Sequence, residues 1–185
     1  MIARFPDGVE LRTAETELRS TGRTLLGHAA VWDRPTLIGG RGGFTEVVKR
    51  GAFAAHLATG ADVFLLAHHD FAQPLARTGN GSLQLREDDK GLAFEAVLPQ
   101  TRAADDILEL ARAGTIAGSS FAFRVPPGGD AWPSRDRREL RAVELVEVSA
   151  VTAPAYAETT ISARARPGGS TGMLPLGLRL IMAGL

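Results

Sequence analysis

Residues 145–151 read LVEVSAV, an apolar stretch interrupted by one acid and one hydroxyl. Both faces of a strand with this sequence are mainly apolar, which is typical of a strand buried on both sides. Residues 62–68, DVFLLAH, form a second nearly continuous apolar run and lie between Gly60 and Asp70. A short apolar run that is bounded in this way again predicts a buried strand.

Alternating side chains predict further strands. Residues 82–86 and 92–98 alternate apolar and polar positions and are separated by a turn at 87–91, which is typical of a hairpin. Residues 23–32 (RTLLGHAAVW) and 44–48 (FTEVV) are also predicted strands. The protein is therefore expected to be richer in strand than in long helix.

Two segments have the spacing of a helix. Residues 103–113 (AADDILELARA) carry two acids early and Arg112 late, which complements the helix dipole, and a glycine follows as a C-cap. Residues 49–58 (KRGAFAAHLA) place Phe53 and Leu57 four positions apart, on one face of a helix. Two or three helices are therefore expected beside the strands.

The remaining segments carry weaker patterns. Residues 1–20 are mixed and charged, and they predict a strand or a loose lead-in. Residues 38–43 predict a mobile glycine-rich loop, because glycine dominates them. Residues 115–125 predict a strand, residues 126–137 a polar loop, and residues 138–152 a long strand-rich run.

These patterns describe mostly strands, with two or three helices, in one compact unit. Because strands and helices do not alternate regularly, an antiparallel β-barrel or sandwich with flanking helices is favoured over a doubly wound sheet. The predicted fold class is α+β and β-rich, and residues 1–162 are assigned to this domain. Residues 163–185 predict a flexible linker, rich in Arg, Gly, Ser and Pro, and an apolar tail.

The composition excludes several classes of function. A chain of 185 residues is long enough for one domain that buries its core without disulfides. The 21 Lys and Arg residues balance the 21 Asp and Glu residues, so no basic excess indicates nucleic-acid binding. The absence of cysteine excludes thiolate catalysis and cysteine-based metal sites.

The sequence also predicts no membrane attachment. The longest apolar run, residues 172–185, is shorter than the ~20 residues that span a bilayer. Residues 1–20 lack the apolar segment of a signal peptide. A cytoplasmic protein is therefore expected.

Residues 118–123, GSSFAF, contain a candidate nucleophile. If this segment is a strand, alternation places Phe121 and Phe123 on the core face and Ser120 on the opposite face, beside small neighbours. A nucleophilic hydroxyl needs such room, because a bulky neighbour would block the substrate carbonyl. Ser119 would share the face of the phenylalanines. A polar strand face near a turn explains the same pattern without chemistry, so both interpretations stay open.

His68 and His69 stand directly before Asp70, at the end of the predicted strand 62–68. A histidine at the edge of a buried strand is half desolvated and oriented, which suits a general base. Adjacent histidines in a strand point to opposite faces, so they are poor joint ligands for one metal. A structural histidine pair at a strand end is the alternative.

Glu147 lies in the middle of the buried strand 145–151. A carboxylate there needs a positive or hydrogen-bonding partner, because desolvation of an unpaired charge is costly. Orienting a catalytic histidine, as in a Ser-His-acid arrangement, is one such partnership. A structural salt bridge to an arginine is the other.

Other polar residues carry weaker signals. His28 and His56 are isolated and lack the spacing of metal ligands. The glycine-rich residues 39–43 match neither a P-loop nor a dinucleotide fingerprint, because no strand–turn–helix context surrounds them. The chain lacks a G-x-S-x-G elbow, so an α/β-hydrolase is not expected. No cofactor and no metal are predicted.

Four motifs occur in an order that resembles one known family. In chain order they are LAHHD at residues 66–70, a predicted turn PLART at 74–78, GSSFAF at 118–123 and LVEVSAVTAPA at 145–155. Upstream, GHAAVW at 27–32 and FTEVVKRGAF at 44–53 match the opening of the same family. Over residues 21–160 the chain resembles the prohead proteases of tailed bacteriophages, the serine peptidases that mature capsids.

The resemblance implies a fold and a catalytic triad. The fold would be like that of herpesvirus assembly proteases, a barrel of mostly antiparallel strands surrounded by helices. The base of the family falls on His69, directly before Asp70. Its nucleophile falls on Ser120, directly before Phe121, and its acidic member falls on Glu147.

The resemblance also implies a function. The chain would be a serine endopeptidase that cleaves the capsid protein precursor, the scaffold region and itself during head maturation of a phage or of a phage-like particle such as a gene transfer agent. It would act in the bacterial host cytoplasm, inside the assembling prohead, without cofactor, nucleic acid or membrane. A homo-oligomer is compatible with this function, since related assembly proteases are often activated by dimerisation.

Two other functions stay open at this point. The chain could be a non-catalytic assembly module whose apolar tail, MLPLGLRLIMAGL at residues 173–185, binds a capsid partner. It could also be a metal hydrolase that uses His68, His69 and Asp70. The metal hydrolase is the least favoured, because adjacent histidines do not easily share one metal.

Overall fold

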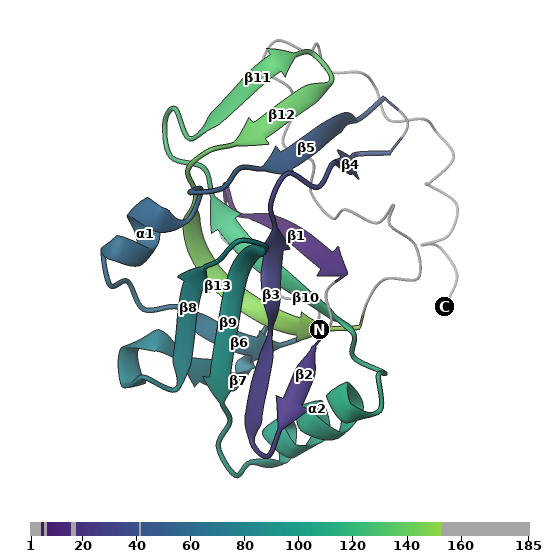
Figure 1. Cartoon of the computed structure of the whole chain (residues 1–185), viewed down its shortest axis with the longest axis vertical. Helices are drawn as coiled ribbons and strands as arrows, with labels where there is room; N and C mark the ends of the chain where they lie inside the picture. The colour runs from purple at the N-terminus through teal and green to yellow at the C-terminus, as the bar shows by residue number, and fades with distance from the viewer. Residues whose placement is uncertain (1–4, 6, 16–17, 41, 153–185) are drawn as a thin grey trace, which may run out of the picture.

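The computed structural model describes residues 5, 7–15, 18–40 and 42–152 (Figure 1). Strands dominate the regular structure of these residues. In chain order the elements are β1 (Glu10–Glu15), β2 (Arg19–Thr21), β3 (Thr24–Val31), β4 (Thr36–Ile38), β5 (Phe44–Val48), α1 (Ala54–Ala58), β6 (Phe64–Ala67), β7 (Asp70–Arg77), the 3-10 turn η1 (Thr78–Asn80), β8 (Leu83–Glu87), β9 (Gly91–Val97), α2 (Arg102–Arg112), β10 (Gly118–Arg124), β11 (Asp130–Ser134), β12 (Arg137–Leu140) and β13 (Glu144–Val151).

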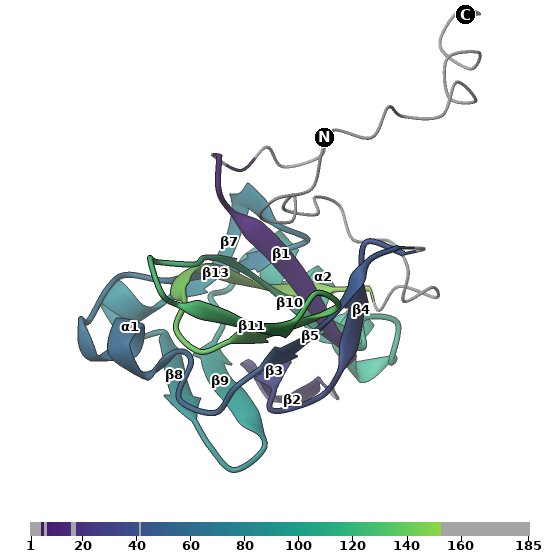
Figure 2. The ribbon, with the colours of Figure 1, turned by 90° about the horizontal axis from the view of Figure 1, so that it is seen from above.

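The described strands are arranged in three sheets. A five-stranded sheet has the order β1-β10-β13-β6-β7, and two four-stranded sheets have the orders β11-β12-β5-β4 and β2-β3-β9-β8. In Figure 1 the sheet that contains β11 lies at the top, and the strand β3 crosses in front of β10. The top sheet faces the viewer in Figure 2. Because β3 packs against both β10 and β1, two of the sheets share one core.

The β-rich prediction is confirmed, but the closed barrel is not. Most neighbouring strands are antiparallel, and β12 pairs with β5 and β13 with β6 in parallel. In the part of the chain that the structure describes, each sheet keeps two edge strands instead of closing on itself. Side-chain alternation along a strand specifies its faces, whereas closure also requires the first and last strands to pair. The local pattern therefore predicts strands but not a barrel.

Both predicted buried strands are confirmed, and they are neighbours. Leu65 and Leu66 of β6 are completely buried, as are Val148 and Ala150 of β13. The two strands lie side by side inside the five-stranded sheet, where both of their faces are covered. This central position decides which residues can reach the candidate site.

The helix α2 confirms the prediction for residues 103–113, and it begins one position earlier. Thr101 is the N-cap, and its side-chain oxygen accepts a hydrogen bond from the backbone N–H of Ala104. The apolar face of the helix buries Ile107 and Leu108 in the core.

The helix α1 is shorter than the predicted helix at residues 49–58. Gly51 adopts a φ of 89°, so the chain turns there and the helix begins only at Ala54. Phe53, just before the helix, is fully buried, and its ring lies 5.5 Å from that of Phe121. The apolar spacing in this segment therefore marks a buried turn followed by a short helix.

Three sequence-based boundaries are wrong. Residues 126–137, predicted as a polar loop, contain β11, which pairs with β12. Residues 138–152, predicted as one run, form β12 and β13 with a break at 141–143. Residues 74–78, predicted as a turn, lie mainly in β7. The strands β7 and β11 are edge strands with many exposed positions, so their sequences lack the apolar pattern of a buried strand.

A buried ion cluster joins β1 to the sheet that contains β5 and β12. Arg12 contacts Glu46 at 2.6 Å and Glu10 at 2.8 Å. Arg138, whose side chain is 1% exposed, contacts Glu10 at 2.7 Å, Glu46 at 3.0 Å and Asp130 at 2.8 Å. Burial raises the pKa of Glu10, but the two arginines lower it more, so this pKa lies below its ordinary value. The cluster holds β1 in place, and β1 is the neighbour of β10.

The predicted linker and tail, residues 163–185, lie outside the described residues, and so does the boundary at 162. None of the described helices is long and apolar enough to cross a membrane.

Candidate active site

His68 and His69 form the two-residue turn between β6 and β7. Ala67 pairs with Asp70, so only the two histidines connect the strands. Their φ angles are 52° and 62°, in the left-handed region that Gly, Asn and Asp usually occupy in such turns. Each non-glycine residue in this region costs on the order of 1 kcal/mol, and strain of this kind is concentrated at functional sites. The histidines therefore lie in a strained turn, and not in the strand end that the sequence predicts.

The turn is held by the neighbouring strand β13. The backbone N–H of His68 donates to the carbonyl of Ala150 at 3.1 Å. The backbone N–H of His69 donates to the hydroxyl of Ser149, also at 3.1 Å. These bonds are available because β6 and β13 are parallel neighbours, with Ala67 opposite Ala150.

Glu147 contacts the side chain of His69. Its Oε1 lies 2.8 Å from Nδ1 of His69, and its Oε2 accepts a hydrogen bond from the hydroxyl of Ser149. The residue is 0% exposed, so the expected need for a partner is confirmed. Within the described residues Glu147 forms its ion pair with this histidine and not with an arginine, which was the alternative.

Ser120 lies on β10, opposite Ser149 of β13, so both side chains are on the same face of the sheet. Its hydroxyl donates to the carbonyl of Arg12 at 2.8 Å, and the residue is fully buried. Among the described residues this is the hydroxyl's one hydrogen bond, so Ser120 is not hydrogen-bonded to His69. The structure thus brings His69 and Glu147 into contact and places Ser120 on the adjacent strand.

Ser119 lies on the other face of β10. Its hydroxyl donates to the carbonyl of His28 on β3, in the direction of the core that contains Phe121. The predicted alternation is therefore correct, because it separates Ser120 from the phenylalanine face. A bulge in the pairing with β13 comes only after Ala122, so it does not disturb the alternation at the two serines.

A cluster of aromatic rings reaches His69 through Phe5. Its side chain is 19% exposed, and the ring of Phe5 approaches it edge-on with 6.0 Å between centroids. Phe5 also contacts Phe71, which is 52% exposed and in turn contacts Phe64. No local pattern predicts this cluster, because its residues come from three separate segments and each segment contributes a single aromatic side chain.

Ser149 is also absent from the candidate residues that the sequence predicts. It stands two positions after Glu147, and side chains two positions apart share one face of a strand. That spacing was the available signal, since any hydroxyl on the face of a buried carboxylate is a candidate donor to it.

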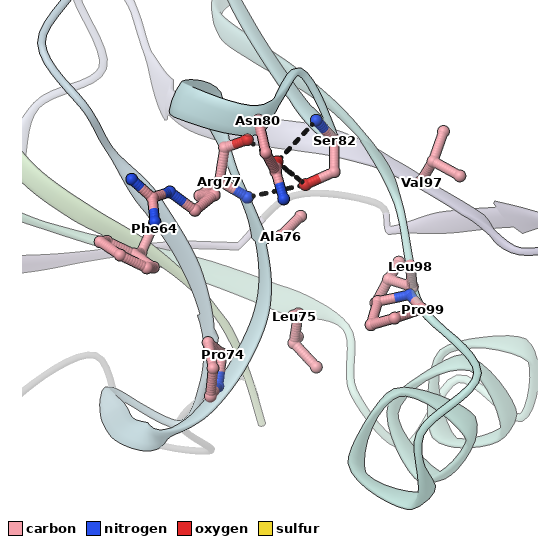
Figure 3. A pocket seen from close by; sticks show the side chains of 10 residues that line it. All are labelled: Phe64, Pro74, Leu75, Ala76, Arg77, Asn80, Ser82, Val97, Leu98 and Pro99. Atoms are coloured by element: carbon pink, nitrogen blue, oxygen red, sulfur yellow. Dashed lines mark hydrogen bonds between the residues drawn. The ribbon is translucent and has the colours of Figure 1, made fainter.

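The pocket of about 460 Å³ shown in Figure 3 is not lined by His69, Ser120 or Glu147. It is lined by Phe64, Pro74, Leu75, Ala76, Arg77, Asn80, Ser82, Val97, Leu98 and Pro99. At its polar end Ser82 accepts a hydrogen bond from the backbone N–H of Arg77, while Asn80 accepts bonds from Ser82 (Figure 3). Of the lining residues, Phe64 also belongs to the aromatic cluster beside His69.

The carboxylate of Asp70 forms its hydrogen bonds with residues of its own strand, β7. This carboxylate accepts hydrogen bonds from the side chain of Gln73 and from the backbone N–H of Ala72, and both hold the pKa of Asp70 below its ordinary value. Across the described part of the chain, no group of three or more potential ligand side chains could hold a metal ion. His68, His69 and Asp70 therefore do not form the metal site that the metal hydrolase hypothesis requires.

Comparison with protein-family models matches residues 9–172 to the caudovirus prohead serine protease family. Neither the curated proteins nor the solved structures gave a significant match. The likeness to herpesvirus assembly proteases therefore stays a prediction. The family match covers most of the chain, including His69, Ser120 and Glu147. This chain belongs to the caudovirus prohead serine proteases, the enzymes of phage capsid maturation.

Proposed function

We propose that the protein hydrolyses peptide bonds in capsid precursor proteins with Ser120 as nucleophile, His69 as general base and Glu147 as the acid that orients the base. The observation that carries this proposal is the 2.8 Å contact between Nδ1 of His69 and Oε1 of Glu147. An ionised carboxylate only accepts hydrogen bonds, so Nδ1 carries the proton and Nε2 keeps a free electron pair. This is the tautomer that a general base needs.

The reaction follows the course of acyl transfer. Nε2 of His69 takes the hydroxyl proton of Ser120 while Oγ attacks the scissile carbonyl carbon, and the protonated imidazole then gives this proton to the departing amine. A water molecule cleaves the resulting ester, with His69 again taking a proton and returning it to Oγ of Ser120. The buried charge of Glu147 stabilises the imidazolium in both halves of the reaction.

The resting hydroxyl of Ser120 is engaged elsewhere. It donates to the carbonyl of Arg12 on β1, and this bond has to be exchanged for one to His69 before the attack. Catalytic hydrogen bonds are often long or poorly aligned in free enzymes and tighten in the substrate complex.

We place the substrate sites in the capsid protein precursor, its scaffold region and the protease itself. The Arg-, Gly- and Ser-rich sequence after Ile161 offers small residues for self-cleavage. The protease would act in the interior of the assembling prohead, inside the host cell.

Co-expression with the capsid precursor encoded beside the protease tests the proposal. The wild type, Ser120→Ala and the matched control Ser119→Ala are compared by intact mass spectrometry of both proteins. We expect the wild type and Ser119→Ala to shorten the precursor, and Ser120→Ala to leave it intact while still folding. Shortening by Ser120→Ala would overturn the assignment of the nucleophile. An intact precursor in all three samples would support the assembly-module hypothesis instead.

A further inference from the structure

We propose that Ser149 is a positioning residue that locks the acid and the base of the candidate triad together. This inference rests on the proposed roles of His69 and Glu147. Ser149 is fully buried on β13 and lies opposite Ser120 of β10. Its hydroxyl contacts both His69 and Glu147. In this role Ser149 takes no part in the proton transfers themselves.

The first contact fixes the carboxylate. The hydroxyl of Ser149 donates to Oε2 of Glu147, while Oε1 faces Nδ1 of His69. Each oxygen therefore has its own partner, and the plane of the buried carboxylate is defined. Without this donor Oε2 would lie buried and unsatisfied, which favours any rotation of the side chain that finds another partner. Such a rotation would move Oε1 away from the imidazole.

The second contact fixes the turn. The same hydroxyl accepts a hydrogen bond from the backbone N–H of His69 at 3.1 Å. His69 has a left-handed backbone, so its position depends on contacts from outside the turn. The N–H of His68 is anchored one residue further along β13, on the carbonyl of Ala150. Ser149 thus ties the backbone of the base to the side chain of the acid.

Only a hydroxyl performs both tasks at one atom. It donates through O–H and accepts through a lone pair, whereas alanine does neither and threonine retains both. A purely structural role predicts that a folded Ser149→Ala enzyme keeps its turnover. A positioning role predicts that kcat falls while KM stays nearly constant, because Ser149 is buried and contacts no substrate.

The test compares wild type, Ser149→Ala, Ser149→Thr and Ser119→Ala as a buried serine control from the same sheet. The substrate is a peptide that spans a cleavage site of the capsid precursor, and kcat is expressed per folded molecule, with the folded fraction taken from circular dichroism. We expect kcat of Ser149→Ala to fall ~10- to 100-fold, the range for a small misplacement of catalytic groups. Ser149→Thr should recover most of the loss, and Ser119→Ala should resemble wild type.

Proton NMR supplies a readout that does not depend on turnover. The Nδ1 proton of His69 should give a low-field signal in wild type and in Ser149→Thr that is lost or shifted in Ser149→Ala. A folded Ser149→Ala enzyme with wild-type kcat and an unchanged signal would overturn the inference. Failure of the proposed function has a different signature, namely cleavage that survives in Ser120→Ala or His69→Asn whatever residue occupies position 149.

Discussion

Nδ1 of His69 and Oε1 of Glu147 lie 2.8 Å apart although 78 positions separate the two residues in the chain. The contact depends on two features of the fold. The parallel strands β6 and β13 place Ala67 beside Ala150, and the left-handed turn after Ala67 then brings His69 back towards Ser149. A fully buried carboxylate thereby meets a partly exposed imidazole.

Replacing the acid should reduce turnover without weakening substrate binding. Glu147→Gln keeps the shape of the side chain but removes its charge, so the imidazolium loses its stabilising partner. We expect kcat to fall about 10²- to 10⁴-fold, as in other triads that lose their acid, with KM nearly unchanged. Peptide hydrolysis kinetics measure both constants. Glu144→Gln, at the exposed start of the same strand, is the control and should resemble wild type. Wild-type kcat in folded Glu147→Gln would remove Glu147 from the mechanism.

The two histidines of the turn should respond differently to substitution. His68 is exposed and has a φ of 52°, so His68→Gly relieves backbone strain. We expect the free energy of unfolding in urea to rise by about 0.5–1 kcal/mol, with cleavage retained. His69→Gly should abolish cleavage, because it removes the proposed base. Loss of cleavage in a folded His68→Gly protein would instead assign the base to His68.

Removing the buried cation Arg138 should destabilise the protein strongly. Arg138→Met leaves the carboxylates of Glu10 and Glu46 buried with one arginine fewer. We expect a loss of about 3–5 kcal/mol in the free energy of unfolding. Arg50→Met is the matched control, because Arg50 pairs with Asp89 on the surface, and it should change stability by less than about 0.5 kcal/mol. Equal effects of the two substitutions would contradict a structural role for the buried cluster.

The same cluster predicts a loss of stability in acid. The pKa of Glu10 in the folded protein lies below its ordinary value of 4.5, so the folded state releases this proton more readily than the unfolded state. Its contribution is complete above pH 4.5 and is lost as the pH falls through the lower folded pKa. Urea unfolding at a series of pH values should show this loss in wild type and a smaller one in Glu10→Gln. Identical pH profiles would exclude Glu10 as its source.

Removing the ring that covers His69 should make this residue more reactive. Phe5 packs edge-on against the imidazole at 6.0 Å, so Phe5→Ala exposes more of it. We expect diethyl pyrocarbonate to carbethoxylate His69 faster than in wild type. Peptide mass spectrometry over time measures this rate. His28 and His56 serve as internal controls in the same sample, and their rates should not change. An unchanged rate at His69 would show that Phe5 does not shield it.

Patterns within single segments were sufficient for much of the fold. The runs at 145–151 and 62–68 predict buried strands, and both become central strands of one sheet. The hairpin at 82–98 and the helix at 103–113 are also confirmed. The separation of Ser120 from Ser119 onto two faces of β10 likewise follows from alternation alone. In each case the pattern that supports the prediction lies within one short segment of the chain.

Two features that leave no apolar pattern in the chain were not predicted from the sequence. The polar loop predicted at 126–137 contains β11, whose pairing with β12 requires no apolar run. The strand predicted at 62–68 ends at Ala67, because pairing of Ala67 with Asp70 forces both histidines into a left-handed turn. Non-glycine residues adopt that conformation only uncommonly, so two adjacent histidines give a weak sequence signal for the turn.

The amino-acid sequence by itself determined that Glu147 would be buried and would need a partner, because the apolar neighbours in its own strand exclude water from the carboxylate. It also determined the face on which Ser120 lies. Only the tertiary structure decided that the side chain of Glu147 contacts His69 and that Ser149 bonds to both residues. The physical reason is that desolvation is set by adjacent residues, whereas the identity of a partner depends on which strands become neighbours in the sheet.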